Sequence, residues 1–257
     1  MQDSTWSNID AREALIREIE AHDIISFDVF DTLVMRKVYF NKDIFLLLAQ
    51  QLPPELRAEF FLARVKAQAA LSREAYPFVE AIYEKASQSC PFITGREAEL
   101  IADEIALEKA MIIPRLDVIA VFDLAKQLGK TVNIISDMYF HQDTIRTILE
   151  DLGISGYQKL LVSSEYHTSK PQRLFEKYME EFPTGRCLHI GDSMDCDIIP
   201  ARKLGIDTFR LRMSTEIYEH EEGAIPPADL HQRTLVAEYV AEKYNSPFYK
   251  TGVGTTR

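Results

Sequence analysis

The chain has 257 residues, 46% of them hydrophobic and 27% charged, which is the composition of a folded globular protein and not of a disordered one. A formal net charge of −11 excludes a broadly basic surface that would displace counterions from a nucleic-acid backbone, so we expect no nucleic-acid partner. Apolar runs are all shorter than the roughly 20 residues of a membrane-spanning helix, and residues 1–10 lack the pattern of a secretory signal. We therefore expect no membrane span and a cytoplasmic location, with three widely spaced cysteines as free thiols.

The first predicted elements are a helix and a buried strand. The helix covers residues 8–21, and an apolar run over residues 24–27 ends in Asp28, as a buried parallel strand with a polar residue at its carboxyl end would. Further along, prolines separate four predicted helices, over residues 42–51, 54–72, 77–89 and 95–111. This stretch contains no strand-like alternation, which indicates an all-helical insertion.

Beyond Pro114 the pattern changes to alternating strands and helices, which is typical of a parallel sheet. The predicted strands cover residues 131–135, 159–162, 186–190 and 207–211, and the predicted helices cover 115–128, 141–152, 169–181 and 195–204. The acidic segment 216–224 is expected to be a solvated loop, followed by a helix over 227–243 and a tail.

These elements predict three parts of the chain. Residues 1–36 and 114–212 would form an α/β core, residues 37–113 a helical insert, and residues 213–257 a C-terminal helix and tail.

Polar residues gather where the predicted strands end. Asp28, Ser136 and Asp192 each close a strand, and Lys170 begins the helix after the third strand of this series. Ligands of open parallel sheets bind at this carboxyl edge, where the strand order reverses. Four separate elements would therefore deliver two carboxylates, a hydroxyl and an ammonium to one place.

The same residues carry a resemblance to a known family. The run FDVFDTL at 27–33 resembles the first motif of the haloacid dehalogenase-like superfamily, and ISD at 135–137 resembles the second. The third and fourth motifs are similar to SKP at 169–171 and HIGDS at 189–193, with Asp197 five residues beyond Asp192. The resemblance implies a Rossmann-like parallel-sheet core with an inserted all-helical cap domain.

The resemblance also implies catalytic roles. Asp28 would attack phosphorus and form an aspartyl-phosphate, which divides one difficult displacement into two easier ones. Ser136 would donate a hydrogen bond to a phosphoryl oxygen, and Lys170 would place its charge on the same group and keep Asp28 ionised. Asp31 is a candidate acid or base. The small phosphorylated substrate would also meet Thr32, Arg36 and Asp137, which stand next to these motifs.

The implied cofactor is Mg²⁺. Asp28, the backbone carbonyl of Phe30 and Asp192 would supply the oxygen ligands that this cation prefers. Asp197 has two interpretations: it orients Lys170 or a metal-bound water, or it is a helix N-terminal carboxylate favoured by the helix dipole.

This sequence departs from the family at position 30. Phosphatases of the superfamily usually have a second aspartate two residues after the nucleophile, as an acid and base, whereas this chain has Phe30 there and Asp31 next to it. General acid–base help typically contributes ~10²–10⁴-fold. Three explanations remain open: Asp31 substitutes, the leaving group needs little protonation (an acyl phosphate, a phosphonate or a phosphoanhydride), or the reaction is dehalogenation, whose branch has an aromatic residue here. A phospho-ligand-binding module without turnover is a fourth alternative.

A closer resemblance concerns the runs FDVFDTLV, SSEYHTSKP and HIGDS, which are similar to predicted bacterial hydrolases found beside or fused to glycosyltransferases in surface-polysaccharide gene clusters. It implies a sugar phosphate or polysaccharide precursor as substrate and a glycosyltransferase domain or protein as partner. The sequence does not determine the oligomeric state.

Overall fold

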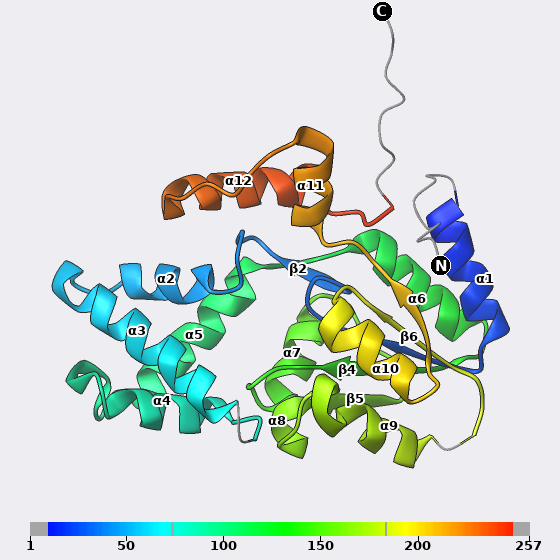
Figure 1. The fold of residues 1–257 in the computed structure, drawn as a ribbon, viewed down its shortest axis with the longest axis horizontal. Helices are drawn as coiled ribbons and strands as arrows, with labels where there is room; N and C mark the ends of the chain where they lie inside the picture. Colours follow the sequence, from blue (N-terminus) through cyan, green and yellow to red (C-terminus); the bar gives the residue numbers. More distant parts are fainter. Residues whose placement is uncertain (1–9, 73–74, 183, 249–257) are drawn as a thin grey trace, which may run out of the picture.

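The computed structural model describes residues 10–72, 75–182 and 184–248, and a five-stranded parallel sheet forms its centre (Figure 1). The strands are β1 (Ile24–Phe27), β4 (Thr131–Ser136), β5 (Lys159–Val162), β6 (Cys187–Gly191) and β7 (Asp207–Arg210). Their order is β5-β4-β1-β6-β7, so the chain builds one side of β1 first and then crosses to the other side. The reversal places the ligand-binding edge of this sheet at the carboxyl end of β1.

Helices cover both faces of the sheet, because alternate strand residues point to opposite sides. On one face Ile25 and Phe27 pack with α1 (Asp10–Ala21), α6 (Leu116–Gln127) and α7 (Gln142–Asp151). On the other face Ile24 packs with residues of α9 (Phe175–Glu181) and α10 (Ile199–Lys203). The remaining short elements are α8 (Ser163–Tyr166) and two π-helical turns, η2 (Lys170–Leu174) and η3 (Met194–Ile198). The predicted α/β core is confirmed.

The predicted helices between the first two motifs are present and lie together to one side of the sheet. They are α2 (Asp43–Gln50), α3 (Pro54–Leu71), α4 (Val79–Ser87), the short η1 (Pro91–Ile93) and α5 (Glu97–Met111). The chain enters and leaves this insert through β2 (Val34–Arg36) and β3 (Ile112–Pro114), which pair antiparallel as a small ribbon. The sequence analysis missed the ribbon because strands of three residues are too short to show an alternation. The division into domains stays a prediction.

The insert has a charged centre. Arg64 of α3 and Glu104 of α5 are both fully buried, and the guanidinium bonds both carboxylate oxygens at 2.7 and 2.8 Å. The Tyr83 hydroxyl donates a further bond of 2.7 Å to the same carboxylate. The sequence does not predict this buried pair, because nothing local identifies Glu104 as the partner of Arg64.

One sequence prediction is wrong. The segment expected to be an acidic loop forms the helix α11 (Ser214–Glu222), and α12 (Leu230–Lys243) follows it. Ile217 is buried, and the acidic side chains find partners: Glu216 pairs with Arg210, and Glu222 with Lys243. Tertiary partners thus stabilise a helix whose composition alone suggested solvent.

Two expectations concern the whole chain. Among the described residues no helix is long and apolar enough to cross a membrane. Cys90, Cys187 and Cys196 are all free, as the spacing predicted.

Breaking the buried pair should unfold the insert's core. We expect Arg64→Met and Glu104→Gln each to lower the free energy of unfolding by about 3–5 kcal/mol, because each leaves a buried partner unpaired. Urea denaturation followed by circular dichroism measures this. The control is Arg96→Met, which removes an exposed pair with Glu99 on α5 and should leave the midpoint nearly unchanged. Equal midpoints for all three variants would contradict the structural role of the buried pair.

Candidate functional site

A cavity of about 730 Å³ lies between the carboxyl edge of the sheet and the helices α2 and α3. The core contributes polar residues to its wall, among them Asp28, Asp31, Asp137, Lys170, Asp192 and Asp197. The insert contributes a mixed set that includes Asn41, Lys42, Phe45, Gln68 and Ser72. Most of the predicted site residues therefore meet at the place where the topology of the sheet predicts a ligand, whereas Ser136 and Thr32 lie behind the cavity wall.

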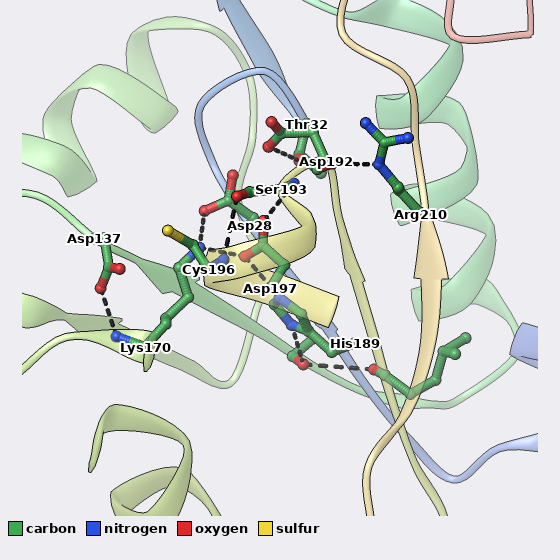
Figure 2. A network of polar contacts seen from close by, with 12 residues as sticks. Asp28, Thr32, Asp137, Lys170, His189, Asp192, Ser193, Cys196, Asp197 and Arg210 are labelled. Carbon is green, nitrogen blue, oxygen red and sulfur yellow. Dashed lines mark hydrogen bonds and ion pairs between the residues drawn. The ribbon is translucent and has the colours of Figure 1, made fainter. Parts of the chain in front are cut away.

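Lys170 joins two carboxylates at the centre of the site (Figure 2). Its ammonium Nζ lies 2.5 Å from Asp28 Oδ1 and 2.5 Å from Asp197 Oδ1, and the side chain is 3% exposed. Asp28 follows β1 directly, and its backbone N–H donates to Ile190 on the neighbouring strand β6. Lys170 starts η2, where a capping box at Ser169 fixes the turn. The end of β1 and the start of η2 thus bring Asp28 and Lys170 together.

The electrostatics of these groups favour a bound cation. Burial lowers the pKa of Lys170, but Asp197 and Asp28 raise it more strongly, so it lies well above its ordinary value. Burial raises the pKa of Asp28 to about 7 against the pull of Lys170. The pKa of Asp192 lies well above its ordinary value, through burial and through repulsion by Asp31, Asp28 and Asp197. The site thus holds more carboxyl groups than ammonium groups, and a cation beside them would favour the ionised carboxylates.

This excess of carboxyl groups shows whether the site fits a metal ion. Asp28, Asp192 and Asp197 each offer a carboxylate oxygen within 4.8 Å of the others. Asp192 accepts only a long bond of 3.5 Å from Thr32 Oγ1 and forms no ion pair with the described residues. Oxygen donors with uncompensated charge are the set that Mg²⁺ prefers. The residues present fit the cation implied by the motifs.

Asp197 differs from the other two carboxylates because its oxygens are already occupied. Oδ1 accepts from Lys170 Nζ and lies 3.1 Å from His189 Nε2, while Oδ2 accepts from the Ser193 backbone N–H. Burial raises its pKa, but Lys170 and His189 outweigh that effect and hold it below the ordinary value. The geometry fits the orientation of Lys170 better than direct binding of a metal.

Asp31 lines the cavity in an unusual backbone conformation. Its φ of 59° is left-handed, which few residues other than glycine adopt, although aspartate tolerates it better than most. Arg115 Nη1 donates to its carbonyl oxygen and holds this turn. Burial raises the pKa of the Asp31 carboxyl, with Arg36 and Arg115 opposing. The carboxylate is thus placed beside Asp192 and within the cavity.

The other predicted site residues have varied surroundings. Ser136 is fully buried at the end of β4, and its hydroxyl has no hydrogen-bond partner among the described residues. Asp137 lines the cavity and accepts from the backbone N–H of Lys170 at 2.9 Å and from the hydroxyl of Ser163. Thr32 is fully buried behind Asp192 and is not part of the cavity wall.

Phe30 and Arg36 form a stacked pair on the cavity wall. The guanidinium carbon lies 3.8 Å from the centroid of the Phe30 ring, and Nε donates to both oxygens of Glu108 at 2.9 and 3.2 Å. The two terminal nitrogens of Arg36 bond no other described residue. Arg36 thus keeps free donors, although Glu108 already offsets its charge.

Comparison with known proteins agrees with this geometry. A family model described as haloacid dehalogenase-like hydrolase matches residues 22–205. The chain belongs to the haloacid dehalogenase-like hydrolases. A search of curated protein sequences finds no match.

Solved structures of other haloacid dehalogenase-like proteins share the fold. The chain is similar to the hydrolase YfnB from Bacillus subtilis bound to magnesium, with 18% identity and a TM-score of 0.52 over 74% of this chain and 88% of that one. The L-2-haloacid dehalogenase from Xanthobacter autotrophicus has 14% identity and a TM-score of 0.52 over 90% and 91%. A phosphatase from Thermococcus onnurineus has 15% identity and a TM-score of 0.53 over 74% and 86%. At these identities the likeness shows the fold of the family and not its reaction.

Sequence reasoning missed several residues of this haloacid dehalogenase-like site. His189 is buried between Ser26 and Asp197, where it supports the carboxylate that holds Lys170. Glu108 lies in the last turn of α5 and Arg115 directly follows β3, and neither has a motif around it. Their partners are distant in sequence, so no local signal could have identified them.

Gly191 is the position where a small change should disturb the site most. A Cβ there would lie 2.4 Å from Asp197 Cγ, and three donors hold that carboxylate in place. We expect Gly191→Ala to lower the free energy of unfolding by about 1–3 kcal/mol through overpacking, and to reduce turnover because Lys170 loses its orientation. Denaturation measures the first effect, and an assay of hydrolase activity measures the second. The control is Gly205→Ala, where a Cβ meets nothing within 4 Å; its φ of 77° still costs stability, but its turnover should stay normal. Normal turnover in Gly191→Ala would contradict the role of this close approach.

Proposed function

We propose that the protein is a Mg²⁺-dependent phosphohydrolase that acts on a small phosphorylated metabolite through an aspartyl-phosphate on Asp28. The observation that carries the proposal is the unbalanced carboxylate cluster of Asp28, Asp192 and Asp197 around the single ammonium of Lys170. A dianionic phosphoryl group would be repelled by this cluster unless a divalent cation offset the charge.

The metal would be held by Asp28 and Asp192, with the backbone carbonyl of Phe30 as a third ligand. When bound, the cation would draw negative charge from the phosphoryl oxygens and from the attacking carboxylate. Asp197 is better placed to serve as a positioning residue, because its oxygens are taken by Lys170, His189 and Ser193.

The chain's own groups would then prepare the attack. The Lys170 ammonium bonds one oxygen of Asp28 and so favours its charged, nucleophilic form. The free oxygen of Asp28 would attack phosphorus. Ser136, whose hydroxyl has no partner among the described residues, has a donor available for a phosphoryl oxygen. Cavity walls from the insert would limit the access of water.

Proton transfer to the leaving group is the step in which this chain departs from its family. Phe30 has no proton to donate, whereas Asp31 lies on the cavity wall and its pKa is raised by burial. We propose that Asp31 protonates the leaving oxygen and later activates water. Phe30 would thus provide the backbone carbonyl for the metal and Asp31 the carboxyl for proton transfer, whereas the family usually has one aspartate at the position of Phe30.

Dehalogenation is the second candidate. The aromatic Phe30 and the shared fold of L-2-haloacid dehalogenases favour it. The buried carboxyl of Asp192 weighs against it, because displacement of a halide needs no divalent cation and would leave that carboxyl without a use. A sugar phosphate substrate, a glycosyltransferase partner and a cytoplasmic location stay predictions.

The first test is phosphate release from p-nitrophenyl phosphate, acetyl phosphate and a panel of sugar phosphates. We expect turnover with Mg²⁺, none with EDTA, and a loss of at least ~10³-fold in Asp28→Asn, which lacks the nucleophile. Halide release from 2-haloacids, unaffected by EDTA, would instead support the dehalogenase. A folded protein that binds Mg²⁺ and turns over neither class of substrate would contradict both.

A second test addresses Asp31. We expect Asp31→Asn to lower the rate of the first step, phosphoryl transfer to Asp28, by ~10²-fold or more with alkyl phosphates and to leave that step nearly unaffected with acetyl phosphate, since a good leaving group needs no proton. Rapid-quench measurement of leaving-group release in a single turnover isolates this step from the later attack of water. Asparagine also tolerates the left-handed backbone. The control is Asp195→Asn, an exposed carboxylate on the same cavity wall, which should change both substrates little. An equal loss of the first-step rate on both substrates in Asp31→Asn would argue against protonation of the leaving group by Asp31.

A further inference from the structure

The C-terminal helices lie across β2 and β3, through which the chain enters and leaves the insert. Figure 1 shows α11 and α12 above β2 and beside α2. Met35 of β2 and Ile113 of β3 pack with Ile217, Val240 and Tyr244 of the two helices. These helices begin at Ser214, beyond the family match that ends at residue 205. They are therefore an addition to the part of the chain that defines the family.

One end of this addition is tied to the core. After α12 the side chain of Asn245 donates to the Pro114 carbonyl at 3.1 Å, and its own carbonyl accepts from Arg115 Nε at 2.8 Å. Arg115 is 1% exposed and also donates to the carbonyls of Arg212 and Asp31. A single buried guanidinium therefore connects the C-terminal segment with the turn that follows the nucleophile.

The other end is tied to the insert. Arg233 of α12 bonds both oxygens of Asp43 at 2.8 and 2.9 Å, and the two residues are 8% and 3% exposed. Tyr39, just before α2, donates to Glu219 of α11 at 2.7 Å. A buried bidentate pair fixes both the orientation and the separation of its two side chains, which an exposed ion pair does not.

Asp43 adjoins the cavity wall without lining it. It is the first residue of α2, and its neighbour Lys42, together with Asn41 and Phe45, lines the cavity wall opposite the carboxylates. Two strands of three residues each could bend as a hinge if nothing held them. The contacts at both ends remove that freedom.

We propose that Arg233 and Asp43 are positioning residues: through them the C-terminal helices brace the β2–β3 ribbon and hold the α2 wall of the cavity at a fixed place relative to the nucleophile turn. The brace itself follows from the contacts alone, and its effect on substrate rests on the proposed function. In this chain the width of the cavity mouth is thus set from outside the family core.

The test is hydrogen–deuterium exchange of the full chain, read by mass spectrometry, for Arg233→Met and Asp43→Asn. We expect exchange in β2, β3 and α2 to rise at least tenfold, with β4 and β6 unchanged. The control is Lys243→Ala, which removes a pair with Glu222 inside the C-terminal helices and leaves Asp43 untouched. It should leave exchange in α2 as it is. Unchanged exchange in β2 and α2 in both variants, or an equal rise in every element, would overturn the proposal.

Kinetics with p-nitrophenyl phosphate give a second result. We expect KM to rise about fivefold or more in Arg233→Met while kcat falls less than threefold, because the wall moves and the reacting groups do not. The double variant D43R/R233D, which reverses the pair, should recover part of the lost affinity. A fall in kcat with an unchanged KM would contradict the assigned role. Absence of any phosphatase activity in the unsubstituted protein would refute the proposed function only, since the exchange experiment needs no substrate.

Discussion

The contact of the Lys170 ammonium with Asp28 and Asp197 is the interaction on which the site depends. It brings together the end of β1, the start of η2 and the turn after β6, three elements that share no local sequence. A lysine buried to this degree is stable only because the carboxylates beside it offset the cost of removing its charge from water. The carboxylates in turn are tolerated because of the lysine. Removing any one partner therefore disturbs the whole edge of the sheet and not one residue.

The excess of negative charge around this contact connects the fold with the proposed reaction. Asp192 and Asp31 bring more carboxylate than Lys170 can neutralise, which costs stability unless a cation binds. Natural sites often retain such a cost where function requires it. Position 30 also departs from what stability alone would favour, because it moves an acidic group into a strained turn. Where the family usually places an acid, this chain has a ring that supports Arg36, and the acidic group moves one residue onward into a left-handed turn.

Much of this architecture could be predicted from the sequence. The strands that end in Asp28, Ser136 and Asp192 were recognisable because buried strands are continuous apolar runs, and the motifs at their ends placed the site at the correct edge. The β2–β3 ribbon and α11 could not be predicted. Their residues are ordered by partners far away in the chain, such as Ile217 against Met35, and neither alternation nor propensity records such contacts. The same reason explains why the sequence did not reveal the buried pair of Arg64 and Glu104.

The central position of β1 also has a consequence for how the protein is made. Ile24 begins the strand at the start of the chain, yet its two neighbours in the sheet are Thr131 and Cys187. During synthesis this apolar strand must wait, unpaired, while the whole insert emerges. Closing such long loops is entropically costly and slows folding. The insert, whose contacts are more local, forms first, and the nucleophile reaches its partners only after the fourth motif has been synthesised. The catalytic edge can therefore assemble only late in synthesis.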